Sequence, residues 1–80
     1  MNPHFGSLVL GLAAQVNAAL EGQLPAEAGA VNGRDVARAL IDSLGMLEEK
    51  TKGNLDPDEQ RLLSEVLTSL RFRFVQGERA

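Results

Sequence analysis

A helix stop signal and a helix start signal lie close together in residues 53–59, and this junction constrains the fold more than any other feature of the chain. Gly53 is the residue type that most often ends a helix in the left-handed conformation. The run Asp56-Pro57-Asp58-Glu59 is typical of a helix start, with Asp56 as N-cap and Glu59 closing a capping box. Because the two signals almost adjoin, we predict an antiparallel αα-hairpin.

The residues on both sides of this junction repeat their apolar positions at helical spacing. We predict one helix over about residues 33–52, with Asn32 as N-cap accepting from the N–H of Asp35. We predict the other over about residues 57–76, ending before Gly77. The two inner stripes consist of Val36, Ala37, Leu40, Ile41, Leu44 and Leu47, and of Leu62, Leu63, Val66, Leu67, Leu70 and Phe74.

Residues 70–75 contain the one conflict in this pattern. Apolar and basic residues alternate there with a period of two, which is also typical of a short strand. We favour the helix, because the segment continues a helix already in phase and the sequence offers no partner strand.

The N-terminal segment forms a third predicted helix, over about residues 3–21, followed by a linker over residues 22–31. Its inner stripe consists of Phe5, Leu8, Val9, Leu12, Val16 and Leu20. Its opposite side carries small residues instead of charges, and residues 5–20 contain no charged side chain. The run is too short and too interrupted by polar residues to span a bilayer, and no Lys or Arg precedes it as in a targeting signal.

Composition limits what such a chain can do. Its 80 residues make one domain, and without cysteine there is neither a disulfide nor a thiolate metal site to supplement a modest core. Stability must therefore come from helix packing, within one chain or between chains. The net charge of -3, with acids and bases interspersed, disfavours bulk electrostatic binding to nucleic acid or to a membrane.

No motif points to catalysis, a cofactor or a metal. The segment Lys50–Asn54 resembles a phosphate-binding turn only in composition, because it falls at a helix end and not at a helix start. The carboxylates of residues 56–59 are better explained by capping than by a cation site, and Glu48-Glu49 by a solvated helix face. His4 has no cysteine or serine motif to activate. We therefore expect a protein that is not an enzyme.

Several segments together resemble one known family. They are residues 41–55, with Leu47-Glu48-Glu49-Lys50-Thr51-Lys52-Gly53-Asn54-Leu55 as the most specific part, the acidic helix start, Leu62-Leu63, the closing Leu70-Arg71-Phe72-Arg73-Phe74-Val75, and the opening Phe5-Gly6-Ser7-Leu8. On these segments the chain resembles the bacterial domain of unknown function 1844 (DUF1844) family over nearly its whole length, with departures at Gly45 and in residues 25–30. The resemblance implies a bacterial protein but no activity, cofactor or site residue, because none is established for the family.

Two surfaces remain without a partner in a three-helix monomer. Burying the uncharged side of the N-terminal helix requires a second copy, so we predict a homodimer or higher oligomer. The candidate interface consists of Ser7, Leu10, Gly11, Ala14 and Ala18. A candidate surface for a further partner consists of Arg71, Phe72, Arg73 and Val75, because Phe72 and Val75 lie away from the inner stripe of the last helix and arginine and phenylalanine are common in interfaces.

Three classes of function follow from these surfaces. The favoured one is a cytoplasmic, non-enzymatic protein-interaction module that associates with itself. The alternative is a nucleic-acid or ribosome accessory protein that uses the Arg/Phe patch, where an aromatic ring between basic residues could stack on a base. A small enzyme or ligand carrier would require a polar pocket, which the sequence does not indicate.

Overall fold

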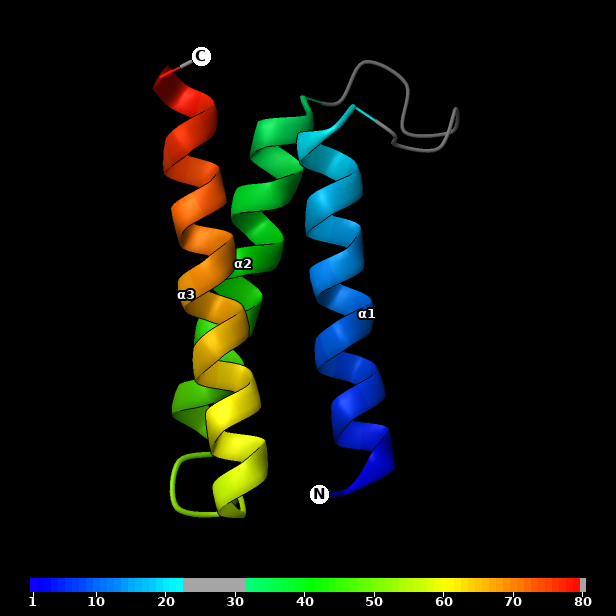
Figure 1. The fold of residues 1–80 in the computed structure, drawn as a ribbon, viewed down its shortest axis with the longest axis vertical. Coiled ribbons are helices and arrows are strands. Elements are labelled where there is room, and N and C mark those ends of the chain that lie inside the picture. The colour runs from blue at the N-terminus through cyan, green and yellow to red at the C-terminus, as the bar shows by residue number, and fades with distance from the viewer. Residues whose placement is uncertain (23–31, 80) are drawn as a thin grey trace.

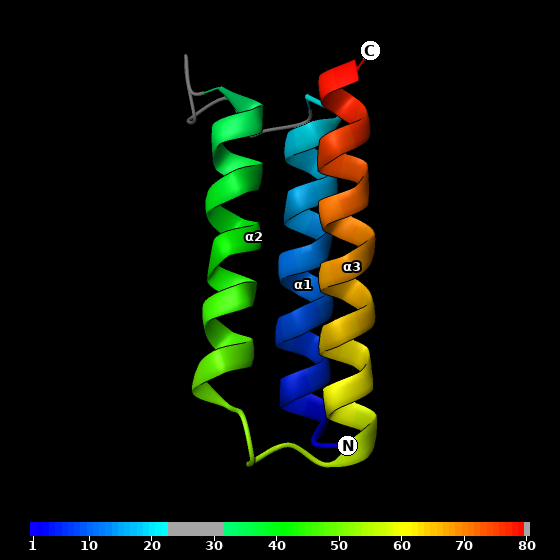
Figure 2. The same ribbon diagram turned by 90° about the vertical axis from the view of Figure 1, so that its left-hand side faces the viewer.

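The computed structural model describes residues 1–22 and 32–79, and these residues form an all-α bundle of three helices. The helices are α1 (Pro3–Leu20), α2 (Gly33–Lys50) and α3 (Pro57–Arg79). α1 and α3 run in the same direction, α2 runs against both, and the N and C ends lie at opposite ends of the bundle (Figure 1). The predicted all-α fold with a C-terminal αα-hairpin is confirmed, and Figure 2 shows α2 and α3 connected by the short turn at one end.

Asparagine caps the start of both α1 and α2. The side chain of Asn2 accepts from the N–H of His4, and that of Asn32 accepts from the N–H of Arg34, each at 2.8 Å. We predicted that the N–H of Asp35 donates to Asn32, and this prediction is wrong by one residue. An N-cap oxygen can bond the second or the third helical N–H, and here it bonds the second. Apart from Gly22, the predicted linker lies outside the described residues.

The ends of α2 and α3 differ from the sequence-based boundaries. α2 ends at Lys50, because Thr51 turns its hydroxyl back to the carbonyl of Leu47 at 2.7 Å and the chain then leaves the helix through Gly53 at φ +88°. α3 continues past residue 76 to Arg79. A single glycine at residue 77 lowers helix propensity by about 1 kcal/mol but does not stop a helix. Residues 70–75 are helical throughout, as predicted.

The core lies along the axis of the bundle and draws equally on all three helices. Its buried residues are Val9, Val16 and Ala19 of α1, Ala37, Ile41 and Leu44 of α2, and Leu63, Leu67 and Leu70 of α3. Full burial of one leucine side chain contributes about 1.5–3 kcal/mol to the stability of the fold. Leu8, predicted on the inner stripe, is instead 50 % exposed. The inward face of α1 is centred on Val9 and Val16, and Leu8 lies about 100° round the helix from Val9.

One buried carboxylate joins the start of α1 to the start of α3. In the predicted capping box, the N–H of Glu59 donates to Asp56 at 2.8 Å and the N–H of Asp56 donates to Glu59 at 3.0 Å. Glu59 is buried, and the second oxygen of its carboxylate accepts from the N–H of Asn2 at 2.9 Å. Glu59 therefore caps its own helix and anchors α1 at the same time.

Asp56 also pairs with the Met1 amine, whose nitrogen lies 3.2 Å from the carboxylate. The hydrogen bond from the N–H of Glu59 is the main cause that holds the pKa of Asp56 below its ordinary value, and the Met1 amine acts in the same direction. The Asp56 carboxylate in turn raises the pKa of the amine. The ionised form of Asp56 is thus the one that the fold stabilises.

Candidate protein-interaction surfaces

The side of α1 that faces away from the bundle is apolar and uncharged, and we call it the α1 outer face. It consists of Ser7, Leu8, Leu10, Gly11 and Ala14, with the polar but uncharged Gln15 among them, all of them exposed. Leu8 and Leu10 are 50 % and 56 % exposed, which places two large aliphatic side chains in water on one helix. Of the five residues predicted to form an oligomer interface, four belong to this face, and the fifth, Ala18, is half-buried.

Gly11 lies at the middle of this face, and none of the described residues of the other helices packs against it. A Cβ atom added there would meet nothing within 4 Å. Glycine in a helix interior costs about 1 kcal/mol relative to alanine, so a glycine here is unfavourable for the isolated subunit. The packing within the chain gives no reason for it.

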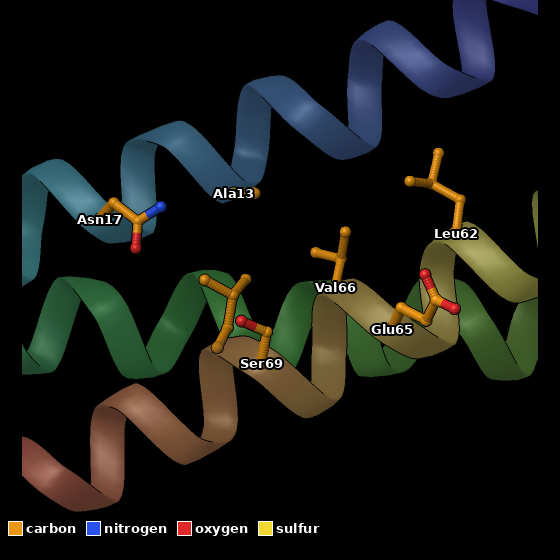
Figure 3. A pocket seen from close by; sticks show the side chains of 7 residues that line it. Ala13, Asn17, Leu62, Glu65, Val66 and Ser69 are labelled. Carbon is orange, nitrogen blue, oxygen red and sulfur yellow. The ribbon is translucent and has the colours of Figure 1, made fainter.

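A groove between α1 and α3 adjoins the α1 outer face. Its volume is about 220 Å³, and it is lined by Ala13, Asn17, Leu62, Glu65, Val66, Ser69 and Leu70. Ala13 and Asn17 on α1 face Leu62, Val66 and Ser69 on α3 across it (Figure 3). Leu10 precedes Ala13 by three residues and therefore lies on the side of α1 that leads into the groove.

The four residues predicted as a partner surface are all exposed, but the two arginines among them turn toward different helices. Arg73 turns toward α1, where it donates to the side chain of Asn17 and lies 3.5 Å from the carboxylate of Glu21. Arg71 turns toward α2 and lies against Gly45. Phe72 and Val75 are exposed, at 63 % and 47 %, as predicted. The arginines on either side of Phe72 therefore serve two different helix contacts.

Sequence reasoning missed a cluster of arginines around Phe74. The Arg34 guanidinium lies 4.0 Å from the centre of the Phe74 ring and donates to the Phe74 carbonyl oxygen at 3.1 Å. The Arg38 guanidinium lies 5.5 Å from the same ring centre. The hairpin could have indicated this contact, because the start of α2 must meet the end of α3 and residues 34 and 38 share one face of a helix.

The described residues hold no other arrangement that suggests chemistry. In residues 1–22 and 32–79, no three His, Asp or Glu side chains are grouped so that they could bind a metal ion. In the same part of the chain, no helix has the length and apolar character needed to cross a membrane. The surfaces described above are thus the features from which a function can be inferred.

The fold and its surfaces define the class: a small all-α protein built as a three-helix bundle with an exposed apolar helix face. The model of the family described as Domain of unknown function (DUF1844) matches residues 2–76, so the chain belongs to this family, and the resemblance seen in the sequence is confirmed. Comparison with the curated proteins and with the solved structures found no match.

Proposed function

We propose that this protein is a non-enzymatic interaction module that works as a homodimer, with the α1 outer face as the surface between the two copies. The observation that carries the proposal is the exposure of Leu8 and Leu10 on a helix with no charged residue from position 5 to position 20. An uncharged helix face flanked by two exposed leucines is unusual on a soluble monomer and fits an interface between subunits.

The small residues of this face, together with the half-buried Ala18, fit a second helix better than they fit water. Ser7, Gly11, Ala14 and Ala18 are spaced by four, three and four positions, which is the seam spacing of two packed helices. Small side chains on a seam allow two helix backbones to approach closely. The intervals of four, three and four positions read the same in both directions along the chain. A two-fold axis that relates two copies of α1 would therefore set small residues against small residues.

The alternative function, nucleic-acid or ribosome binding through the Arg/Phe patch, is less well supported by the contacts and charges of the chain. The guanidinium of Arg73 is already engaged by Asn17 and Glu21. A phosphate would have to compete with that carboxylate, and the chain as a whole carries a net charge of -3. We therefore favour a protein as the partner class.

We also propose that the module acts in the bacterial cytoplasm. The resemblance to the DUF1844 family implies a bacterial source, and the match of the family model to residues 2–76 supports that resemblance. Val9, Val16 and Ala19 of the apolar N-terminal run are used in the core of the bundle, which supports a role for this run as a helix of the folded domain.

Gly11→Leu tests the proposed dimer most simply. A Cβ atom at this position would meet nothing within 4 Å among the described residues, so the subunit should still fold. Ala39→Leu, which places the same leucine side chain on the exposed side of α2, is the matched control. In sedimentation velocity we expect Gly11→Leu to shift the chain toward monomer and Ala39→Leu to behave as the unmodified chain. Equal association of all three proteins would contradict the proposal.

A further inference from the structure

A second groove lies between α2 and α3, away from the α1 outer face. Its volume is about 280 Å³, and it is lined by Arg38, Ile41, Asp42, Arg71, Phe74 and Val75. The two helices that form it are joined by the short turn at one end of the bundle (Figure 2). Its lining combines apolar side chains with two arginines, a combination that is enriched where proteins bind one another.

The floor of this groove is apolar and held in place. Ile41 is buried, and Phe74 is half-buried beside it. The Phe74 ring is fixed from one side by the Arg34 guanidinium at 4.0 Å from its centre. Val75 extends the apolar surface outward, with 47 % of its area exposed. A preformed apolar floor of this kind can receive a hydrophobic side chain without first rearranging.

The walls of the groove supply positive charge that is not neutralised by a salt bridge. Arg38 lies 5.5 Å from the centre of the Phe74 ring, and Arg71 lies across Gly45, where an added Cβ would stand 3.2 Å from its guanidinium nitrogen. Neither arginine forms a salt bridge with another residue of the described chain. Asp42 also lines the groove, so its positive charge is local and not a continuous basic surface.

We infer that this α2–α3 groove binds a short acidic segment of another protein, with a hydrophobic side chain of that segment on Phe74 and Val75 and carboxylates on Arg38 and Arg71. Arginine binds a carboxylate through two parallel hydrogen bonds, which matches discrete acidic side chains. A nucleic acid would bring phosphates at regular intervals, and one of them would face the Asp42 carboxylate. The groove therefore favours an acidic peptide.

Selection from a library of random short peptides displayed on phage, with the full chain immobilised, tests this inference. We expect enrichment of peptides in which Asp or Glu flanks Leu, Ile or Phe. No enrichment, or enrichment without acidic residues, would overturn the inference. The selection is independent of the proposed dimer, because the groove uses residues of α2 and α3 only.

Charge variants then locate the binding site of a selected peptide by fluorescence anisotropy. Arg38→Gln and Arg71→Gln should each weaken binding about tenfold or more, the size typical of a lost charged hydrogen bond. Arg61→Gln, an exposed arginine of α3 outside the groove, is the matched control and should leave binding unchanged. Asp42→Asn should strengthen binding several-fold, because it removes the negative charge from the wall.

Two outcomes of these measurements would overturn the inference. One is an affinity for the selected peptide that Arg38→Gln and Arg71→Gln leave as it was. The other is binding of a single-stranded oligonucleotide, measured in parallel, that the same two variants abolish, since this would make the groove a nucleic-acid site.

Discussion

The outer faces of α1 and α2 belong to helices of equal length in one bundle, yet they differ in chemistry. α2 exposes Asp35, Arg38, Asp42, Glu49 and Lys50, as expected of a helix face in water. α1 exposes leucines and small residues, and its segment from position 5 to position 20 has no charge at all. Packing within the bundle therefore explains the charged surface of α2 but not the uncharged surface of α1.

One glycine in each of these two helices shows the same contrast. Gly33, the first residue of α2, is required within the chain, because a Cβ atom there would clash with the carbonyl oxygen of Ala19 at the end of α1. A Cβ atom at Gly11 would meet nothing within 4 Å in residues 1–22 and 32–79. The first glycine lets two helices of one subunit approach closely, and we infer that the second does so between subunits.

The same charged substitution on the two faces should have the largest effect. Ala14→Glu would bury an unpaired carboxylate in the proposed dimer, so we expect association to weaken by about 3 kcal/mol or more, which is about a hundredfold. Ala39→Glu, on the exposed side of α2, should leave association unchanged. Sedimentation velocity measures both. Similar behaviour of the two variants would remove the distinction between the faces.

Alanine in place of each glycine should have opposite effects on the subunit. We expect Gly33→Ala to lower the free energy of unfolding by about 1–3 kcal/mol, because the clash with the Ala19 carbonyl forces the two helices apart. Gly11→Ala should raise it by up to about 1 kcal/mol through helix propensity. Urea denaturation at concentrations below those at which the chain associates measures both changes. A Gly33→Ala variant as stable as the unmodified chain would refute the close approach.

A smaller effect on stability is expected at Asp56. This residue belongs to the contacts between the starts of α1 and α3 and not to the α1 outer face. The pKa of Asp56 is lower in the folded chain than in the unfolded one. The stabilisation is therefore complete above the unfolded value of about 3.9 and is lost as the pH falls through the lower, folded value. We expect the melting temperature to fall over that acidic range less steeply in Asp56→Asn, which keeps a capping oxygen, than in the unmodified chain.

Asp58→Asn is the control for this measurement. Its carboxylate lies next to the capping box but accepts no hydrogen bond from the described residues, so its removal should leave the acid dependence as it was. The idea fails if Asp56→Asn and the unmodified chain lose stability in parallel over the acidic range.

Local patterns in the sequence were sufficient for much of this fold. The capping box of Asp56 and Glu59 and the turn at Gly53 could be predicted because each depends on residues a few positions apart. The exposure of Gly11 and Ala14 followed from helical periodicity alone. Periodicity was less exact at the edges of a stripe, which is why Leu8 was wrongly assigned to the core.

Contacts between distant residues could not be predicted in the same way. The hydrogen bond from Asn2 to Glu59 joins residues 57 positions apart, and that from Arg34 to Phe74 joins residues 40 positions apart. A periodic pattern identifies the face of a helix but not the residue it meets on another helix. The separation of Arg71 from Arg73, two residues apart in sequence but turned toward different helices, has the same cause.

Sedimentation equilibrium of the unmodified chain across the micromolar range tests the central claim most directly. If the outer face of α1 joins two copies, the data will fit a reversible monomer–dimer equilibrium, with a limiting mass of twice that of the chain. A single species of monomer mass at every concentration would contradict the account, because Leu8, Leu10 and Gly11 would then face water without a partner.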